Sequence, residues 1–295
     1  MNLLITGGTG FIGSALCSRL LKDNHNITIL SRHPEIVKSP VTAIEAISQL
    51  TTDVFFDVVI NLAGEPIVNK RWSSSQKQRI LSSRIDTTKQ LITFLTKVEN
   101  KPKLLINGSA IGYYGIGNTN ELIDEKSTGD GSFSSQLCQQ WEEIALQAEA
   151  IGIRTCLLRT GIVLGKGGGA LSKMLVPFKM GLGGKIGDGK QWMSWIHLDD
   201  LIGIILYCIT HDNLTGAING TSPSPVTNQV FSKTLGTVLN RPTIFPMPRI
   251  MVKLLMGQMG EELLLSGKRI MPMKVSAAGY NFQYKTLKGA LKNLL

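Results

Sequence analysis

The sequence predicts an α/β fold, a doubly wound parallel sheet followed by a small, mostly helical C-terminal portion. Three observations predict it. Short, nearly continuous apolar runs recur along the chain, segments with helical periodicity lie between most of them, and the pattern changes after about residue 165. Strands that are apolar throughout are typical of sheets covered on both faces. Parallel strands joined by crossover helices are therefore the expected architecture.

The expected strands are residues 1–6, 26–31, 56–64, 103–110, 154–165 and 216–222. The first helix is predicted from Ile12, Ala15, Leu16 and Leu20, which follow an i, i+3, i+4, i+8 rhythm. Leu81, Ile85, Thr88, Ile92 and Leu95 follow a similar rhythm in a second helix, which Lys101-Pro102 stops.

The second half of the chain changes composition twice. "GKGGGALSKMLVPFKMGLGGKIGDGKQ" is rich in Gly and Lys, and we interpret residues of about 165–195 as a mobile segment over a site. From about residue 240 the chain is rich in Pro, Met and Leu. We predict a nucleotide-binding Rossmann domain over residues 1–240 and a small C-terminal domain over residues 241–295.

Composition narrows the class of protein. The 295 residues carry a formal net charge of +10, which favours an anionic partner. The basic residues form no run, so a nucleic acid is not expected. The four cysteines form no CxxC pair, which predicts reduced thiols and no metal site. With no signal peptide, and a longest apolar stretch (201–210) of half the ~20 residues that span a bilayer, we expect a cytoplasmic protein with no membrane partner.

A glycine-rich turn follows the first strand. In "TGGTGFIG", Gly8, Gly10 and Gly13 satisfy G-x-G-x-x-G, while Gly7, Gly10 and Gly13 satisfy G-x-x-G-x-x-G. Between a strand and an amphipathic helix, this spacing is typical of a dinucleotide site, because main-chain amides at the helix start face the pyrophosphate. The predicted contacts of the turn are Gly7, Gly10, Phe11, Ile12 and Gly13.

The end of the second strand selects between the two nicotinamide cofactors. An NAD site offers an acid there to the adenosine ribose, but this chain has "ILSRHP". Ser31 and Arg32 replace the acid, and a guanidinium can bind a 2′-phosphate. We predict NADP(H), with a plain surface role as the alternative for Arg32.

At this point the chain resembles the extended short-chain dehydrogenase/reductase superfamily, through "TGGTGFIG", "NLAG", "GSAIGYYG" and "WIHLDDL" in that order. It is more similar still to the atypical epimerase-like branch with an extra C-terminal domain, through "LRTGIVLGKGGGAL", "GLGGKIGDGKQWMSWIHLDDL" and "GYNFQYKTLKGAL". The resemblance implies that the C-terminal portion lies on the substrate side. It also implies adenosine contacts at Leu62, Ala63 and Gly64, and a phosphate contact at Arg84.

The superfamily's catalytic pair is missing. The resemblance implies a Tyr followed four residues later by a Lys on the helix after the strand that ends in Ser109, but "SFSSQLCQQWEEIALQAEA" contains neither. Ser134 with Cys138, or Ser135 with Gln139, stands in their place. The one Tyr-x-x-x-Lys, Tyr284 to Lys288, lies in the C-terminal tail and is interpreted as a coincidence.

The candidate catalytic residues are therefore Ser109 and Tyr114. Tyr114 matches a position that faces substrate in related enzymes, but no lysine is placed to lower its pKa from about 10. Candidate substrate contacts are Tyr113, Gln191, Trp195 and His197, with a structural role as the alternative for His197. Lys166 and Lys185 are either contacts to an anionic substrate or ordinary loop lysines.

We predict an NADP-dependent oxidoreductase or epimerase-like enzyme of the extended short-chain dehydrogenase type, acting on a small carbonyl or sugar-like substrate. The alternative is a catalytically inactive NADP(H)-binding redox sensor or scaffold, which the missing pair favours. A homodimer through the long helix at about Ser75 to Val98 is a further expectation. Substrate identity, reaction direction and proton donor stay open.

Overall fold

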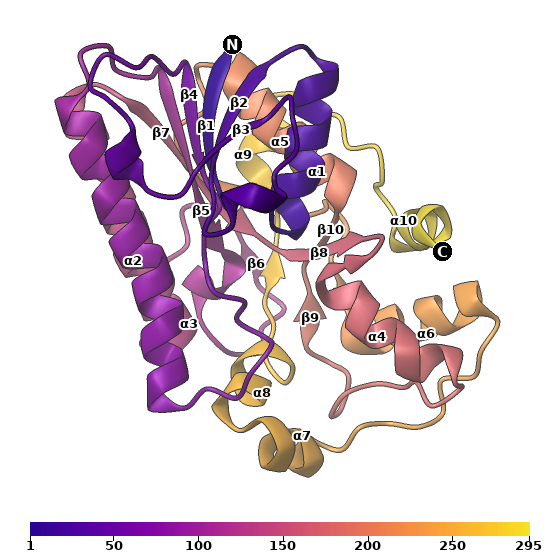
Figure 1. The fold of residues 1–295 in the computed structure, drawn as a ribbon. Helices are drawn as coiled ribbons and strands as arrows, with labels where there is room; N and C mark the ends of the chain where they lie inside the picture. The colour runs from indigo at the N-terminus through magenta and orange to yellow at the C-terminus, as the bar shows by residue number, and fades with distance from the viewer.

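The computed structural model describes residues 1–295 and is built on a seven-stranded sheet in which every neighbouring pair is parallel (Figure 1). The strand order is β11-β7-β5-β4-β1-β2-β3, so the chain reverses its direction across the sheet between β1 and β4. In open α/β sheets, ligands bind beside the carboxyl ends of the strands at such a reversal. The parallel seven-stranded sheet confirms the predicted fold class, a doubly wound α/β fold. The strands are β1 Asn2–Thr6, β2 Asn26–Leu30, β3 Thr42–Ile44, β4 Val58–Asn61, β5 Leu104–Ala110, β7 Arg154–Thr160 and β11 Gly216–Gly220.

Helices cover both faces of the sheet (Figure 1). On one face lie α1 (Phe11–Lys22) and α5 (Leu198–Thr210), which bury residues such as Leu16 and Ile205. On the other lie α2 (Ser74–Lys97) and α3 (Phe133–Leu146), which bury Ile85 and Trp141. Burial on both faces explains why the central strands are apolar along their whole length.

Two details of the sheet differ from the prediction. The edge strand β3 is short, half exposed and carries no long apolar run, so it was missed. The run 154–165 is two strands, because β8 (Ile162–Gly165) leaves the sheet and pairs with β10 (Trp195–His197). The break falls at Gly161, where a Cβ atom would lie 2.4 Å from the carbonyl oxygen of Ser194.

Most of the remaining elements lie beyond β8 or belong to the C-terminal portion, while β6 lies below the sheet and pairs with β13 (Figure 1). The C-terminal portion is mostly helical, as predicted. No helix combines the length and the apolar character needed to cross a bilayer. These elements are α4 Gly169–Lys179, α6 Asn228–Leu239, α7 Arg249–Met256, α8 Gln258–Leu263, α9 Met273–Ala277, α10 Leu287–Leu294, and the two-residue strands β6 Leu122–Ile123, β9 Trp192–Met193, β12 Val226–Thr227 and β13 Arg269–Ile270.

The C-terminal helices return to the rest of the chain. Val275 of α9 packs in the core beside the sheet, and α10 contributes Leu287 and Leu291 to a cluster with Trp195 and Phe231. Residues on both sides of position 240 therefore build the same cores. The domain boundary at residue 240 stays a prediction.

Candidate functional site

The glycine-rich turn after β1 is close-packed. Gly7 has φ +70°, and a Cβ atom there would lie 2.6 Å from the carbonyl oxygen of Leu62. A Cβ atom on Gly13 would lie 2.2 Å from the carbonyl oxygen of Gly7, which also accepts a hydrogen bond from the amide of Gly10 at 3.0 Å. The backbone contacts at Gly7 and Gly13 match the G-x-x-G-x-x-G spacing, because only glycine fits at either end of the turn.

The turn presents free amides. The N–H groups of Phe11, Ile12 and Gly13 make no hydrogen bond within the protein, and Gly10, the N-cap of α1, has no side chain to cap them. These donors stand at the positive end of a 12-residue helix dipole. The turn therefore fits a phosphate group bound through the main chain.

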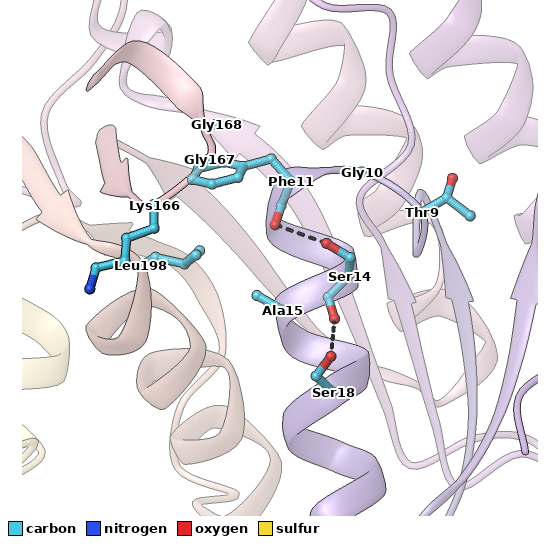
Figure 2. Close-up of a pocket in the computed structure, with 10 residues that line it drawn as sticks. All are labelled: Thr9, Gly10, Phe11, Ser14, Ala15, Ser18, Lys166, Gly167, Gly168 and Leu198. Carbon is cyan, nitrogen blue, oxygen red and sulfur yellow. Dashed lines mark hydrogen bonds between the residues drawn. The ribbon is translucent and has the colours of Figure 1, made fainter. Parts of the chain in front are cut away.

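A pocket of about 470 Å³ lies beside this turn, between the start of α1 and residues 166–168 (Figure 2). The Phe11 ring closes one side, because a Cβ atom on Gly168 would lie 2.3 Å from it. The hydroxyls of Ser14 and Ser18 donate back to carbonyl oxygens of their own helix, at 3.4 and 2.9 Å. Lys166, which has no hydrogen-bond partner, supplies the pocket's cationic group. The lining residues are Thr9, Gly10, Phe11, Ser14, Ala15, Ser18, Lys166, Gly167, Gly168 and Leu198.

The end of β2 carries an unpaired cation. Ser31 is buried, and its hydroxyl accepts a hydrogen bond from the amide of His33 at 3.1 Å. Arg32 is exposed and makes neither a hydrogen bond nor an ion pair. The nearest carboxylate in sequence, that of Glu35, lies 3.3 Å from the His33 ring. The guanidinium of Arg32 is therefore available to an anion.

Arg84 of α2 lies against the end of β4. A Cβ atom on Gly64 would lie 2.7 Å from the Arg84 guanidinium carbon, so glycine makes room for this side chain. One guanidinium nitrogen donates to the carbonyl oxygens of Glu65 and Ile80, at 3.1 and 3.0 Å. Arg84 and residues 62–64 thus share one edge of the sheet.

A buried polar network joins the carboxyl ends of the central strands. Asn61 of β4 accepts a hydrogen bond from Thr6 of β1 at 2.5 Å and donates to Asn107 of β5 at 2.6 Å. It also donates to Thr88 of α2 at 2.8 Å, and Trp141 of α3 donates to the same hydroxyl at 2.9 Å. A satisfied buried network fixes the positions of its members. The network therefore fixes the strand ends from which the candidate site residues project.

Ser109, at the end of β5, is held by an ion pair. Its hydroxyl donates to a carboxylate oxygen of Glu142 at 2.6 Å. Arg159 of β7 binds both oxygens of that carboxylate, at 2.9 and 2.8 Å. Glu142 and Arg159 are 5% and 4% exposed. Ser109 is itself 6% exposed, so only a small part of its surface, with the lone pairs that remain after it donates to Glu142, is available to another group.

Tyr114 extends the same network. Arg159 donates to the Tyr114 hydroxyl at 3.0 Å, and that hydroxyl donates to Asn219 at 2.7 Å. Tyr114 is 0% exposed, and burial raises the pKa of its phenol to about 12. The prediction that Tyr114 supplies a proton therefore meets two physical obstacles in this structure. The Tyr113 ring, by contrast, is half-buried and lies 3.3 Å from the Arg159 guanidinium.

The residues in place of the missing pair have structural partners. Ser134 donates to Glu262 of α8 through its amide, at 3.0 Å, and its hydroxyl. Ser135 donates to the carbonyl oxygen of Tyr113 at 2.7 Å and accepts from Gln139 at 3.1 Å. Burial raises the pKa of the Cys138 thiol to about 11, so it stays protonated at neutral pH.

Three predicted substrate contacts are buried among protein atoms. Gln191 donates to the carbonyl oxygens of Ile186 and Leu264, and Trp195 donates to that of Ser224. His197 caps α5 by accepting the amide of Asp199 at 3.1 Å, so its other ring nitrogen, 3.2 Å from Asn293, carries the proton. Burial lowers the pKa of His197. The structure gives these side chains almost no surface to offer a substrate.

Glu142, Arg159 and Asn219 were missed as site residues. A signal for them exists, because each is a polar residue where the expected strand or helix should be buried: Arg159 in "TCLLRTG", Glu142 in "WEEIAL" and Asn219 in "GAING". A buried polar side chain requires a partner. Only the fold shows that Arg159 bonds both Glu142 and Tyr114, and that Asn219 accepts from Tyr114.

Residues 3–219 match the NAD dependent epimerase/dehydratase family, and residues 247–294 match a domain of unknown function (DUF1731). Epimerase family protein YfhF of Bacillus subtilis is 38% identical over 100% of this chain and 98% of its own. The chloroplastic SDR39U1 homolog of Arabidopsis thaliana is 37% identical over 100% of this chain and 87% of its own. The crystal structure of human epimerase family protein SDR39U1 with NADPH has a TM-score of 0.89 and 36% identity, covering 100% and 99% of the two chains.

Proposed function

Because the chain belongs to the NAD dependent epimerase/dehydratase family, we propose that it is an NADP(H)-dependent oxidoreductase or epimerase-like enzyme acting on a small carbonyl or sugar-like substrate. One observation carries the choice of cofactor. The unpaired guanidinium of Arg32 stands where a carboxylate would repel a 2′-phosphate. The human relative solved with NADPH supports the same choice.

Within this proposal, different residues bind different parts of the cofactor. The amides of Phe11, Ile12 and Gly13 bind the diphosphate, assisted by Arg84. Ser31 and Arg32 bind the 2′-phosphate, and residues 62–64 line the adenosine. A nicotinamide bound here supplies or accepts a hydride, while the protein orients it.

Within this proposal Ser109 faces the substrate. The Glu142 carboxylate fixes the Ser109 hydroxyl, whose free lone pairs then accept a hydrogen bond from a substrate hydroxyl. Tyr114 holds the buried guanidinium of Arg159 in place, so it is a positioning residue. Tyr113, half-buried beside Arg159, is the phenol that remains open to a ligand.

Calorimetric titration with NADPH and NADH tests the cofactor proposal. The native protein should prefer NADPH, and Arg32→Asp should lower NADPH affinity by about tenfold to a hundredfold, because it removes a charge-assisted pair and adds a repulsive charge. Lys38→Asp is the matched control, since it makes the same charge change on an exposed residue of the same connection. No binding of either nucleotide, or an unchanged preference in Arg32→Asp, would refute the proposal.

Turnover is tested separately. The protein is screened with NADPH against carbonyl compounds for loss of the reduced nicotinamide absorbance, and with NADP against nucleotide sugars for an epimerised product, since epimerisation returns the hydride and leaves the absorbance unchanged. Turnover that Ser109→Ala lowers would support the role of Ser109. Tight binding without turnover across the panel would instead support the inactive sensor or scaffold.

A further inference from the structure

Helix α7 exposes apolar side chains. Val252 is its one buried residue, and Ile250, Leu254 and Leu255 are 71%, 71% and 57% exposed. Val252 packs against Gly260 of the next helix, where a Cβ atom would lie 2.7 Å from it. Clustered exposed apolar residues of this size usually mark an interaction site.

The apolar surface continues beyond the helix. Residues 245–247 pair with residues 183–187 through three backbone hydrogen bonds of 2.9 to 3.3 Å. This pairing places residues 245–247, just before α7, beside residues 183–187, at the end of the molecule where α7 projects (Figure 1). We call residues 179–187 and 241–256 the α7 face. Its exposed apolar residues are Met180, Leu182, Ile244, Phe245, Met247, Ile250, Met251, Leu254 and Leu255.

The charge of the α7 face has one sign. The two segments contain five basic residues and no acidic one. Arg241 donates to the main-chain carbonyl oxygen of Lys179 at 2.9 Å, which joins the two segments. Glu261 of α8 lies 3.7 Å from Arg249 and 2.8 Å from Lys253 and balances part of their charge. The basic residues are Lys179, Lys185, Arg241, Arg249 and Lys253.

We propose that the α7 face docks the protein onto the surface of an anionic lipid bilayer. A short helix with apolar residues outward and Lys or Arg at its flanks is the arrangement of interfacial helices, which lie in the plane of a membrane. The net charge of +10 attracts the whole chain to an anionic surface. The docking is peripheral and involves no membrane-spanning helix, but it departs from the expectation that the protein has no membrane partner. It gives a role to part of the segment that matches a domain of unknown function.

Co-sedimentation with vesicles tests this inference. The full chain should sediment with phosphatidylcholine vesicles that contain phosphatidylglycerol, and not with phosphatidylcholine alone, and rising salt should weaken binding. The double variant Leu254→Ser, Leu255→Ser should bind at least about tenfold more weakly, because two exposed apolar side chains no longer enter the bilayer. Ile36→Ser, at a site 62% exposed and outside the α7 face, should bind like the native protein.

The same experiments distinguish a lipid bilayer from a second copy of the chain as the partner of the α7 face. The substituted leucines are exposed, so the thermal midpoint of the double variant should equal that of the native chain, and a loss of binding then reports the surface alone. Absence of binding, equal binding to neutral vesicles, or an unaffected double variant would overturn the inference. So would light scattering that shows a dimer which the double variant dissociates, since the face would then cover a second copy.

Discussion

Glu142 and Arg159 show how a buried ion pair organises several side chains. Each neutralises the other, Glu142 also accepts the hydroxyl of Ser109, and Arg159 also donates to Tyr114. A buried pair gains little over apolar packing when intact, but breaking it leaves an uncompensated charge. The pair therefore specifies the geometry around Ser109 more than it stabilises the fold.

Glu142→Gln should lower the free energy of unfolding by about 3–5 kcal/mol, because the guanidinium of Arg159 stays buried without its counter-charge. Urea denaturation measures the change. Glu143→Gln is the control, since this neighbouring glutamate is exposed and should change stability by less than about 0.5 kcal/mol. A Glu142→Gln protein within about 1 kcal/mol of the native one would show that the pair is not needed.

His197 predicts a pH dependence. Burial lowers its pKa, with Asp199 and Asp200 acting in the opposite direction and Lys166 in the same one. The unfolded chain then binds a proton at about pH 6.5 that the folded chain does not, so stability falls as pH falls from about 6.5 toward the lowered value. Urea denaturation at pH 7.5 and 5.5 should show the loss, and His197→Asn, which keeps an N-cap acceptor, should reduce it.

Helix α5 connects the sheet to the C-terminal segment. Its buried Asp200 accepts the amides of Gln283 and Tyr284 at 2.8 and 2.9 Å, and the Tyr284 ring stacks on His197 at 3.8 Å. The "WIHLDDL" motif was expected near the site. In the structure His197 and Asp200 anchor residues 280–293, and Tyr284 of the tail Tyr-x-x-x-Lys packs there.

Asp200→Ala should destabilise the protein by about 2–4 kcal/mol, because two part-buried amides lose a charged acceptor. Hydrogen exchange should speed up at residues 283 and 284 before it changes in β1 or β4. Asp199→Ala is the matched control, since Asp199 is exposed on the same turn. Equal exchange in the two variants would contradict the anchoring role.

Local patterns predicted the elements that local physics determines. The glycine turn was predicted because its spacing sits between a strand and a helix, and the central strands because they are buried on both faces. The break between β7 and β8 at Gly161 was not predicted, because it depends on a contact with Ser194, more than thirty residues later. The contact between Glu142 and Arg159 likewise joins a helix to a strand, and no spacing in the sequence encodes it.

Residues before and after position 240 share the apolar clusters of the molecule. Leu291 of α10 is fully buried beside Trp195, Phe231 and Leu164, so the last helix completes a cluster begun by β8. The outward face of α2, by contrast, is polar, with Asp86, Lys89, Gln90 and Thr93 exposed. The homodimer through this helix stays a prediction.

Leu291→Ala should cost about 2–5 kcal/mol, because it opens a cavity in that cluster. Thermal unfolding followed by tryptophan fluorescence and by far-ultraviolet circular dichroism should still give one coincident transition at a lower midpoint. Lys292→Ala, on the exposed side of the same helix, should unfold like the native protein. Two separate transitions would instead support an independent unit over residues 241–295.

The position of α10 also affects biosynthesis. About 70 residues separate β11 from Leu291, and translation at roughly 5–20 residues per second takes several seconds to add them. During that interval β8 and β10 have already been made, but α10, the helix that covers them, is still inside the ribosome or has not been synthesised. At this stage the apolar cluster is incomplete and its surface is exposed, so this is when the growing polypeptide would benefit most from a chaperone.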